Sequence, residues 1–200
     1  VQTHLAENPD ELVATAQAFP DSADYLAVYE DHGLCGPRSL FAHCIHLSEA
    51  AWDRMATRGV AVAHCPDSNF FLGSGCMSLQ APVSRGIRVG LGTDVGAGRS
   101  FSLRQVMASA HDAALAVGAR VGAEALLWYA TRGGARALGL GNVGCLAPGH
   151  EADIVAVDVP EYVQATGEDD ADHARLYDAI AFRRDAGPAR AVLVRGQVLR

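Results

Sequence analysis

The sequence predicts an α/β fold in which parallel strands alternate with helices. Four short apolar runs have the length and composition of buried strands: VQTH (residues 1–4), LFAH (40–43), VAVAH (60–64) and IRVGLGTD (87–94). Helix-like stretches separate these runs, and strands that alternate with helices pair in parallel through crossover connections. The strand ends at positions 4, 43, 64 and 94 are 39, 21 and 30 residues apart. Such spacings suit the βα units of either a barrel or a doubly wound sheet.

The expected helices carry recognisable terminal signals. Residues 9–19 begin with Asp10 and Glu11, which suit a helix amino end. Residues 48–59 run from Ser48, an N-cap residue, to Gly59, a carboxyl-terminal stop. After the fourth strand, the sequence predicts two longer helices over residues 102–118 and 122–140.

A change of composition near Asn142 indicates a second unit. Residues 144–158 combine Gly and Pro with a strand-like segment, and the polar stretch 165–175 predicts an exposed loop. Residues 189–200 predict a hairpin of two short strands around Arg195 and Gly196. We therefore expect one unit over residues 1–142 and a small, β-rich unit over residues 143–200.

Composition limits the possible partners. Half of the 200 residues are hydrophobic and a fifth are charged, as in a soluble globular protein. The net charge of −7 argues against binding to nucleic acid or to an anionic membrane. No apolar run is long enough to span a membrane, and the first residues lack the features of a signal peptide. The five cysteines are scattered without a C-x-x-C pair, which favours reduced thiols in a cytoplasmic protein.

Each predicted strand ends in a polar, titratable residue. These residues are His4, His43, His64 and Asp94. A single histidine at a strand end is more often a hydrogen-bonded structural residue than a ligand. However, the carboxyl ends of parallel strands share one face, where active sites of α/β barrels are built. Imidazole and carboxylate are ligands of catalytic zinc, so one shared metal site would explain the whole set.

Glu7 follows His4 by three residues, just beyond the expected strand end. A carboxylate there could take a proton from an attacking water and give it to a leaving nitrogen. Glu7 could equally be a charge partner of a helix amino end. Spacing alone leaves both interpretations open.

Two familiar motifs are absent. The segment GLGTDVG has Gly90 and Gly92, but its next glycine, Gly96, is one position too far along for a dinucleotide-binding fingerprint. The chain also lacks the H-x-E and P-C-x-x-C motifs of zinc deaminases that act on nucleic-acid bases. A deaminase activity would therefore require another fold.

Five segments together resemble the guanine deaminases of the amidohydrolase superfamily. They are THLAEN (3–8), FAHCIHLS (41–48), HCPDSNFFLGSG (64–75), GLGTDVGAGRSFS (90–102) and GCLAPGHEADIVAVD (144–158). The resemblance implies the second half of a (β/α)8 TIM-type barrel in residues 1–142 and part of a small β-sandwich in residues 143–200. It also implies hydrolytic deamination of guanine to xanthine and ammonia, a step of purine catabolism.

The resemblance assigns roles residue by residue. His4 and Asp94 would bind one Zn²⁺ per active site, with Fe²⁺ as a possible substitute. Glu7 would shuttle protons to the purine ring and Asp94 would accept the proton of the water. His43 would orient the water or the substrate, so Glu7 and His43 would both contact the purine. His64 has no direct role in this scheme, and His46 is more simply a hydrogen-bonded loop histidine than a support for the site.

The chain departs from the family pattern at its start. The family's first strand supplies an H-x-H pair of zinc ligands, and no such pair precedes His4. Because the sequence begins with Val1 inside an expected strand, we expect the complete protein to begin earlier. The complete enzyme is expected to be a cytoplasmic homodimer. Two alternatives remain: another deaminase or chlorohydrolase of the superfamily, of the S-adenosylhomocysteine or triazine type, and a half-barrel fragment without catalytic activity.

Overall fold

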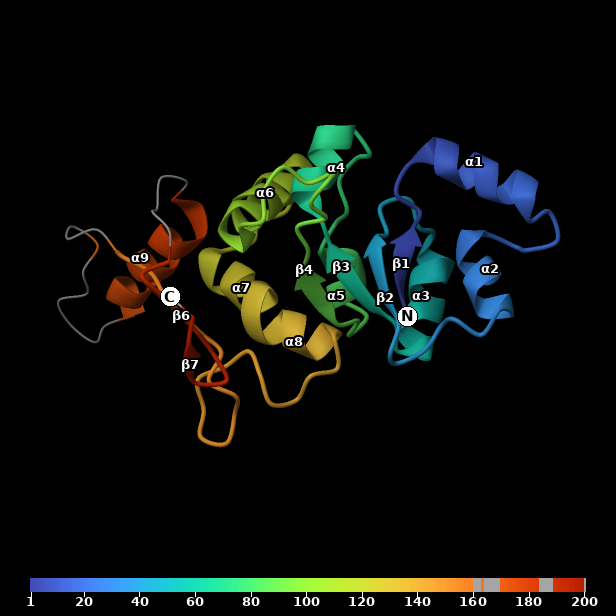
Figure 1. Cartoon of the computed structure of the whole chain (residues 1–200). Helices are drawn as coiled ribbons and strands as arrows, with labels where there is room; N and C mark the ends of the chain where they lie inside the picture. The colour runs from blue at the N-terminus through green and yellow to red at the C-terminus, as the bar shows by residue number, and fades with distance from the viewer. Residues whose placement is uncertain (160–162, 164–169, 184–188, 200) are drawn as a thin grey trace.

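The computed structural model describes residues 1–159, 163, 170–183 and 189–199 (Figure 1). Its centre is a four-stranded parallel sheet with the strand order β1-β2-β3-β4. The strands span Gln2–Leu5, Leu40–His43, Ala61–His64 and Val89–Leu91. The predicted parallel arrangement of the four apolar runs, in chain order, is confirmed.

The register of the sheet separates a buried face from a face that carries His4. Phe41 pairs with Val62, and Val62 pairs with Val89. These three side chains belong to the main hydrophobic core, together with Trp52 and Met55 of the helix α3, Glu49–Arg58. The opposite face has small residues beside the histidine, since His4 pairs with Ala42 and Ala42 with Ala63. Helix α3 therefore packs on the face of the sheet opposite His4.

The connection from β1 to β2 contains two helices, α1 (Pro9–Ala18) and α2 (Tyr25–Asp31), and α3 follows β2. The predicted ends of α3 are confirmed. The side chain of Ser48 accepts a hydrogen bond from the backbone N–H of Ala51. Gly59 ends the helix with a φ of 71°, a left-handed conformation that glycine adopts without steric cost.

The helices α4 (Pro66–Leu72) and α5 (Gln80–Val83) lie between β3 and β4 and were not predicted. Helix α4 starts directly after Cys65, with Pro66 in its first turn, where a missing N–H costs nothing. The next three residues are polar and buried: Asp67, Ser68 and Asn69. This turn brings polar groups to the carboxyl end of the sheet.

Helix α6 (Leu103–Ala116) was predicted, but the expected single helix over residues 122–140 is interrupted. It consists of α7 (Ala123–Trp128), a π-helical turn over Tyr129–Gly133 and α8 (Gly134–Ala137). A Cβ on Gly133 would lie 2.7 Å from the Trp128 ring, and a Cβ on Gly90 would lie 2.8 Å from the Cα of Gly134. Gly133 thus leaves room for the Trp128 ring within the segment, and Gly90 lets α8 approach β4 closely.

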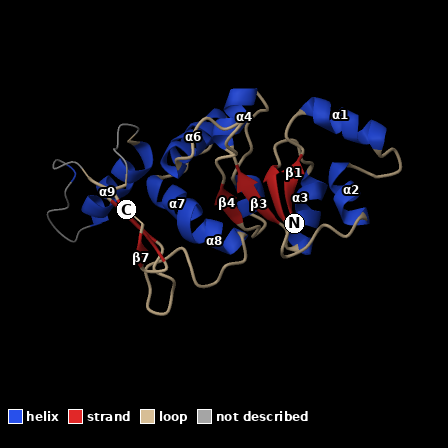
Figure 2. Cartoon of the chain, viewed as in Figure 1, coloured by secondary structure: helices blue, strands red, loops and turns tan. Residues whose placement is uncertain are grey.

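The second sheet is antiparallel, in the order β5-β6-β7, with strands Ile154–Ala156, Ala191–Val194 and Gln197–Val198. The predicted hairpin around Arg195 and Gly196 is confirmed. Figure 2 shows this sheet at a distance from the parallel sheet, with helices between them. The described part of the chain has no helix of sufficient length and apolarity to cross a membrane.

The predicted loop over residues 165–175 is wrong for residues 170–175, which form the start of α9 (Asp170–Phe182); residues 165–169 lie outside the described part. The apolar residues of α9 are concentrated in its second half, where Tyr177, Ala181 and Phe182 contact Met107 and Leu126. Its polar first turns resemble a loop in composition. Packing of α9 against α6 and α7 supplies the stabilisation that its first half lacks.

Candidate active site

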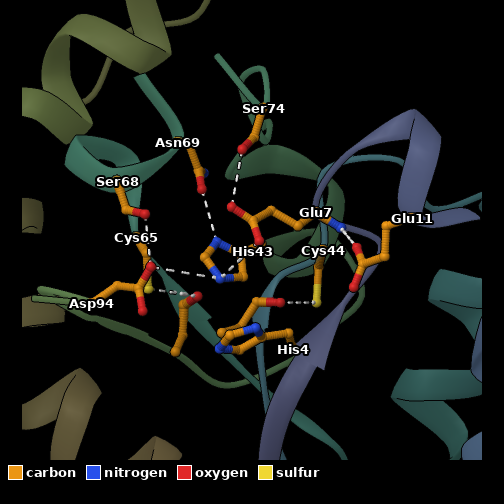
Figure 3. A network of polar contacts seen from close by, with 12 residues as sticks. His4, Glu7, Glu11, His43, Cys44, Cys65, Ser68, Asn69, Ser74 and Asp94 are labelled. Atoms are coloured by element: carbon orange, nitrogen blue, oxygen red, sulfur yellow. Dashed lines mark hydrogen bonds and ion pairs between the residues drawn. The ribbon is translucent and has the colours of Figure 1, made fainter. Parts of the chain in front are cut away.

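Three of the four strand-end residues converge at the carboxyl end of the sheet. One ligand atom each of His4, His43 and Asp94 lies within 4.8 Å of the others (Figure 3). His43 and Asp94 have φ angles of 68° and 45°, a left-handed conformation that is uncommon for residues other than glycine. Such backbone conformations are found disproportionately at functional sites. Here they turn both side chains off the end of the sheet and towards His4.

His64 does not join this group, although it ends β3 as His43 ends β2. Its side chain is buried, and both ring nitrogens lack a hydrogen-bond partner among the described residues. Burial, together with the neighbouring His43, lowers the pKa of His64 to about 4. His64 is therefore a neutral histidine at neutral pH.

Glu7 faces the same site from the turn that follows β1. Its Oε2 lies 3.8 Å from Nε2 of His43, and its Oε1 accepts a hydrogen bond of 2.9 Å from the Ser74 hydroxyl. The amino end of α1 is capped instead by Asn8, whose side chain accepts from the N–H of Glu11. Glu11 in turn accepts a hydrogen bond of 2.7 Å from the backbone N–H of Glu7. The Glu7 side chain thus points into the site and away from the helix end.

The first turn of α4 contacts the site with consecutive side chains (Figure 3). Oδ1 of Asn69 lies 2.8 Å from Nδ1 of His43, and the hydroxyl of Ser68 donates a hydrogen bond of 2.6 Å to Oδ2 of Asp94. Asp67 accepts a hydrogen bond of 2.8 Å from the backbone N–H of Arg99 and pairs with its guanidinium, which lowers the pKa of the Asp67 carboxyl. One helical turn therefore holds two site residues and the loop beyond β4.

Sequence reasoning did not assign roles to Ser68, Asn69 and Ser74. All three lie within HCPDSNFFLGSG, a segment noted above only for its resemblance to the family. A usable signal was present, because three polar residues follow a proline directly after an apolar strand. Polar groups in a first helical turn at a strand end point towards the face where the strand-end residues gather.

Two thiols lie beside the site but are not among the groups that converge there. Burial, together with the carboxylates of Asp94 and Glu7, raises the pKa of Cys65 to about 12. Burial also raises the pKa of Cys44 far above its usual range. The donors that converge at the site are therefore the nitrogen and oxygen atoms of His4, His43 and Asp94.

These donors fit a catalytic zinc. Nε2 of His43 is buried and has no hydrogen-bond partner among the described residues. It lies 3.8 Å from Asp94 Oδ2, too far for a hydrogen bond. The rings of His4 and His43 meet edge to face with centroids 5.0 Å apart. Imidazole and carboxylate groups that converge without bonding to one another have the ligand chemistry of an open zinc site, to which His4 and Asp94 would contribute.

Comparison with known proteins agrees with this geometry. The model of the amidohydrolase family matches residues 1–199. The chain belongs to the amidohydrolase family.

Among curated members of this family, guanine deaminase of Escherichia coli (strain K12) is 42% identical over 159 residues, covering 79% of this chain and 36% of the relative. A 5-methylthioadenosine/S-adenosylhomocysteine deaminase of Nitratidesulfovibrio vulgaris is 39% identical over 164 residues, covering 80% of this chain and 36% of the relative. The matched region is thus little more than a third of these relatives' length.

Solved amidohydrolase structures match nearly the whole chain. E. coli guanine deaminase superposes with a TM-score of 0.88 at 33% identity, covering 98% of this chain and 47% of the other. Guanine deaminase from C. acetobutylicum, solved with guanine in its active site, superposes with a TM-score of 0.84 at 31% identity, covering 99% of this chain and 48% of the other. An adenosine deaminase from Xanthomonas campestris, solved with bound zinc, superposes with a TM-score of 0.84 at 29% identity, covering 99% of this chain and 44% of the other. The mixed α/β fold with a parallel sheet corresponds to about half of each enzyme.

Proposed function

We propose that this chain is the carboxy-terminal half of a zinc-dependent guanine deaminase, which converts guanine and water to xanthine and ammonia. The observation that carries the proposal is the convergence of His4, His43 and Asp94, with Glu7 facing them, in a chain that resembles guanine deaminases. Because the chain spans less than half of the enzymes it matches, the activity belongs to the complete protein.

His4 and Asp94 would bind the zinc, and the remaining ligands would come from polypeptide outside these 200 residues. When bound in such a site, zinc lowers the pKa of a coordinated water to about 7 and so supplies a nucleophile at neutral pH. Ser68 holds Asp94 by one oxygen, Oδ2. The zinc bound in the structure of the Xanthomonas campestris adenosine deaminase supports this assignment of the metal.

Glu7 and Asp94 would divide the proton transfers. The water that adds to C2 of guanine loses a proton to Asp94, and Glu7 protonates the ring nitrogen next to C2. Asp94 then gives its proton to the amino group as the C2–N bond breaks and ammonia leaves, and the remaining hydroxyl proton at C2 passes to Glu7, which restores both carboxyl groups to their starting states. Glu7 suits this role because Oε1 is bound by Ser74, while Oε2 faces Nε2 of His43 and the site.

His43 would orient the water or the purine through Nε2. With Nδ1 directed at Oδ1 of Asn69, a neutral ring would donate from Nδ1 and present an unprotonated Nε2 to the site. Nε2 can then accept a hydrogen bond from the water or from a purine N–H. Contacts of this kind would make His43 and Glu7 the residues of this chain that touch the substrate.

We also propose that the complete protein closes an eight-stranded barrel. Within the described part of the chain, β1 and β4 each have a neighbouring strand on one side only. Four further strands would pair with both of these edges and remove them. Residues 1–142 would then form the second half of the barrel and residues 143–200 part of a small β-sandwich, with α9 returning to pack on α6 and α7.

A substrate panel tests the function. The purified complete protein, loaded with zinc, is expected to release ammonia from guanine with a higher kcat/KM than from 5-methylthioadenosine, S-adenosylhomocysteine or chlorinated triazines. A preference for one of these would favour the related hydrolases, of which the Nitratidesulfovibrio vulgaris deaminase is 39% identical to this chain. No turnover of any of them by the zinc-loaded protein would contradict a hydrolase and favour a non-catalytic fragment.

A further inference from the structure

We propose that Ser74 is a positioning residue for Glu7, fixing the carboxylate so that only Oε2 exchanges protons in the site. This inference rests on the proposed function. The Ser74 hydroxyl donates a hydrogen bond of 2.9 Å to Oε1 of Glu7, across 67 positions of sequence. Ser74 is buried, and the Glu7 side chain is only 13% exposed. A hydroxyl that donates to a carboxylate makes a charge-assisted bond, stronger than one between neutral groups.

Ser74 is itself held in place by the surrounding backbone. Its N–H donates to the carbonyl of Asn69, and its own carbonyl accepts a hydrogen bond of 2.9 Å from Nε2 of His46. The neighbouring Gly75 has a φ of 121°, and a Cβ there would lie 3.2 Å from a methyl group of Ile45. The segment at Ser74 and Gly75 therefore packs closely against the loop after β2, which restricts the position of the Ser74 hydroxyl.

The same loop also fixes the backbone of Glu7. The N–H groups of Ile45 and His46 both donate to the carbonyl of Ala6, the residue before Glu7. His46 thus connects to both ends of the Ser74–Glu7 pair: to the strand end through Ala6 and to the serine through its ring. This gives His46 a supporting contact, where the sequence favoured a hydrogen-bonded loop histidine without a role.

This arrangement has a consequence for the chemistry. A glutamate that accepts and returns a proton must keep one oxygen within hydrogen-bond reach of both partners. Glu7 has three rotatable bonds, so a carboxylate without a fixed partner would spend much of its time in unproductive rotamers. The Ser74 hydrogen bond removes that freedom at Oε1 and leaves Oε2 facing His43. Loss of the hydroxyl should lower kcat and leave KM nearly unchanged.

A double-mutant cycle in the complete enzyme tests the inference. The variants are Ser74→Ala, Glu7→Gln and their combination, with Ser74→Cys as a second variant of similar size and weak donor strength in case the alanine fails to fold. Ser39→Ala is the matched control, because both serines are 5% exposed. The Ser39 hydroxyl donates to the carbonyl of Leu34, which is not part of the site. Zinc content and thermal unfolding are measured for each protein.

We expect Ser74→Ala and Ser74→Cys to lower kcat roughly 10- to 100-fold, as expected for a lost hydrogen bond to a charged group, with zinc retained and KM within about twofold. In the Glu7→Gln background the same change should alter kcat less than about threefold, because coupled residues are not additive. An equal loss in both backgrounds, or a loss no larger than that of Ser39→Ala, would overturn the inference.

The test separates this inference from the proposed function. If the wild-type enzyme prefers another substrate of the panel, the proposed substrate is wrong and the cycle is run with the preferred one. A crystal structure of Ser74→Ala gives a readout that does not depend on turnover. We expect the Glu7 carboxylate to leave its wild-type position or to occupy several; a carboxylate that stays in place would contradict the role of Ser74.

Discussion

Oδ1 of Asn69 lies 2.8 Å from Nδ1 of His43, and this contact sets which nitrogen of the buried ring faces the site. Asn69 comes from the first turn of α4, whereas His43 ends β2. The helix that follows β3 therefore orients a candidate-site side chain at the end of the neighbouring strand, β2. Supports of this kind, one residue removed from the chemistry, commonly contribute 10- to 100-fold to metal affinity or activity.

Replacement of Asn69 by leucine should leave the Nδ1–H of His43 without an acceptor in a buried place. We expect the ring to change its tautomer or its orientation and kcat to fall roughly 10- to 100-fold. Nitrogen-15 NMR of the imidazole distinguishes the tautomers: wild type should show the proton on Nδ1 at neutral pH, and the variant a mixture. An unaltered His43 spectrum together with unaltered turnover would show that Asn69 has no such role.

Ser68→Ala removes the hydroxyl that donates a hydrogen bond of 2.6 Å to Oδ2 of Asp94. Because a carboxylate ligand is oriented by such a bond, we expect zinc to dissociate about 10- to 100-fold more readily. Competition with a chelator of known affinity measures this. Ser39→Ala serves as the control, since the Ser39 hydroxyl is also buried but donates to the carbonyl of Leu34, outside the site. Equal zinc affinities for Ser68→Ala and the control would remove Ser68 from the account.

His64 should make the stability of the folded protein depend on pH. Its pKa is about 4 in the folded state against an ordinary value of 6.5, so the unfolded chain binds more protons between these values. Burial of the neutral ring therefore does not reduce the free energy of unfolding above about pH 6.5, and this free energy decreases as the pH falls towards 4. The full loss amounts to roughly 3 kcal/mol at 1.36 kcal/mol per pKa unit.

Urea unfolding of the complete protein between pH 7.5 and 4.5 measures this dependence. His64→Leu removes the titrating group, so the difference in unfolding free energy between wild type and variant should change with pH in favour of the variant as the pH falls. His32→Leu is a suitable control, since His32 is exposed and lies at the end of α2. Parallel pH profiles for wild type and His64→Leu would contradict the assignment.

The sequence predicted the parallel sheet and the convergence of its strand ends because both depend on local features. An apolar run of four or five residues followed by a polar one defines a strand end such as His4 or His43 without knowledge of the rest of the chain. The same pattern misplaced His64 with the others. His43 and Asp94 leave the sheet with positive φ angles, which turn their side chains into the site. His64 does not have a positive φ angle, and its side chain stays outside the site.

The contacts of α4 and α9 could not be predicted from the sequence, for a different reason. Ser68 and Asn69 act on Asp94 and His43 from 26 positions away, so their roles depend on how two crossover connections are placed in space. Helix α9 is stabilised by its packing on α6 and α7, while its first turns have the composition of a loop. Local propensity cannot reveal either relationship.

Zinc content and guanine turnover, measured together for Glu7→Gln and His4→Ala in the complete enzyme, distinguish a proton-transfer role for Glu7 from a role as metal ligand. We predict that Glu7→Gln retains one zinc per active site and loses on the order of 10²- to 10⁴-fold in kcat, because an amide cannot accept and return a proton. His4→Ala should lose the zinc and the activity together. Loss of zinc from Glu7→Gln in step with its activity, or near-normal turnover with zinc retained, would contradict the account.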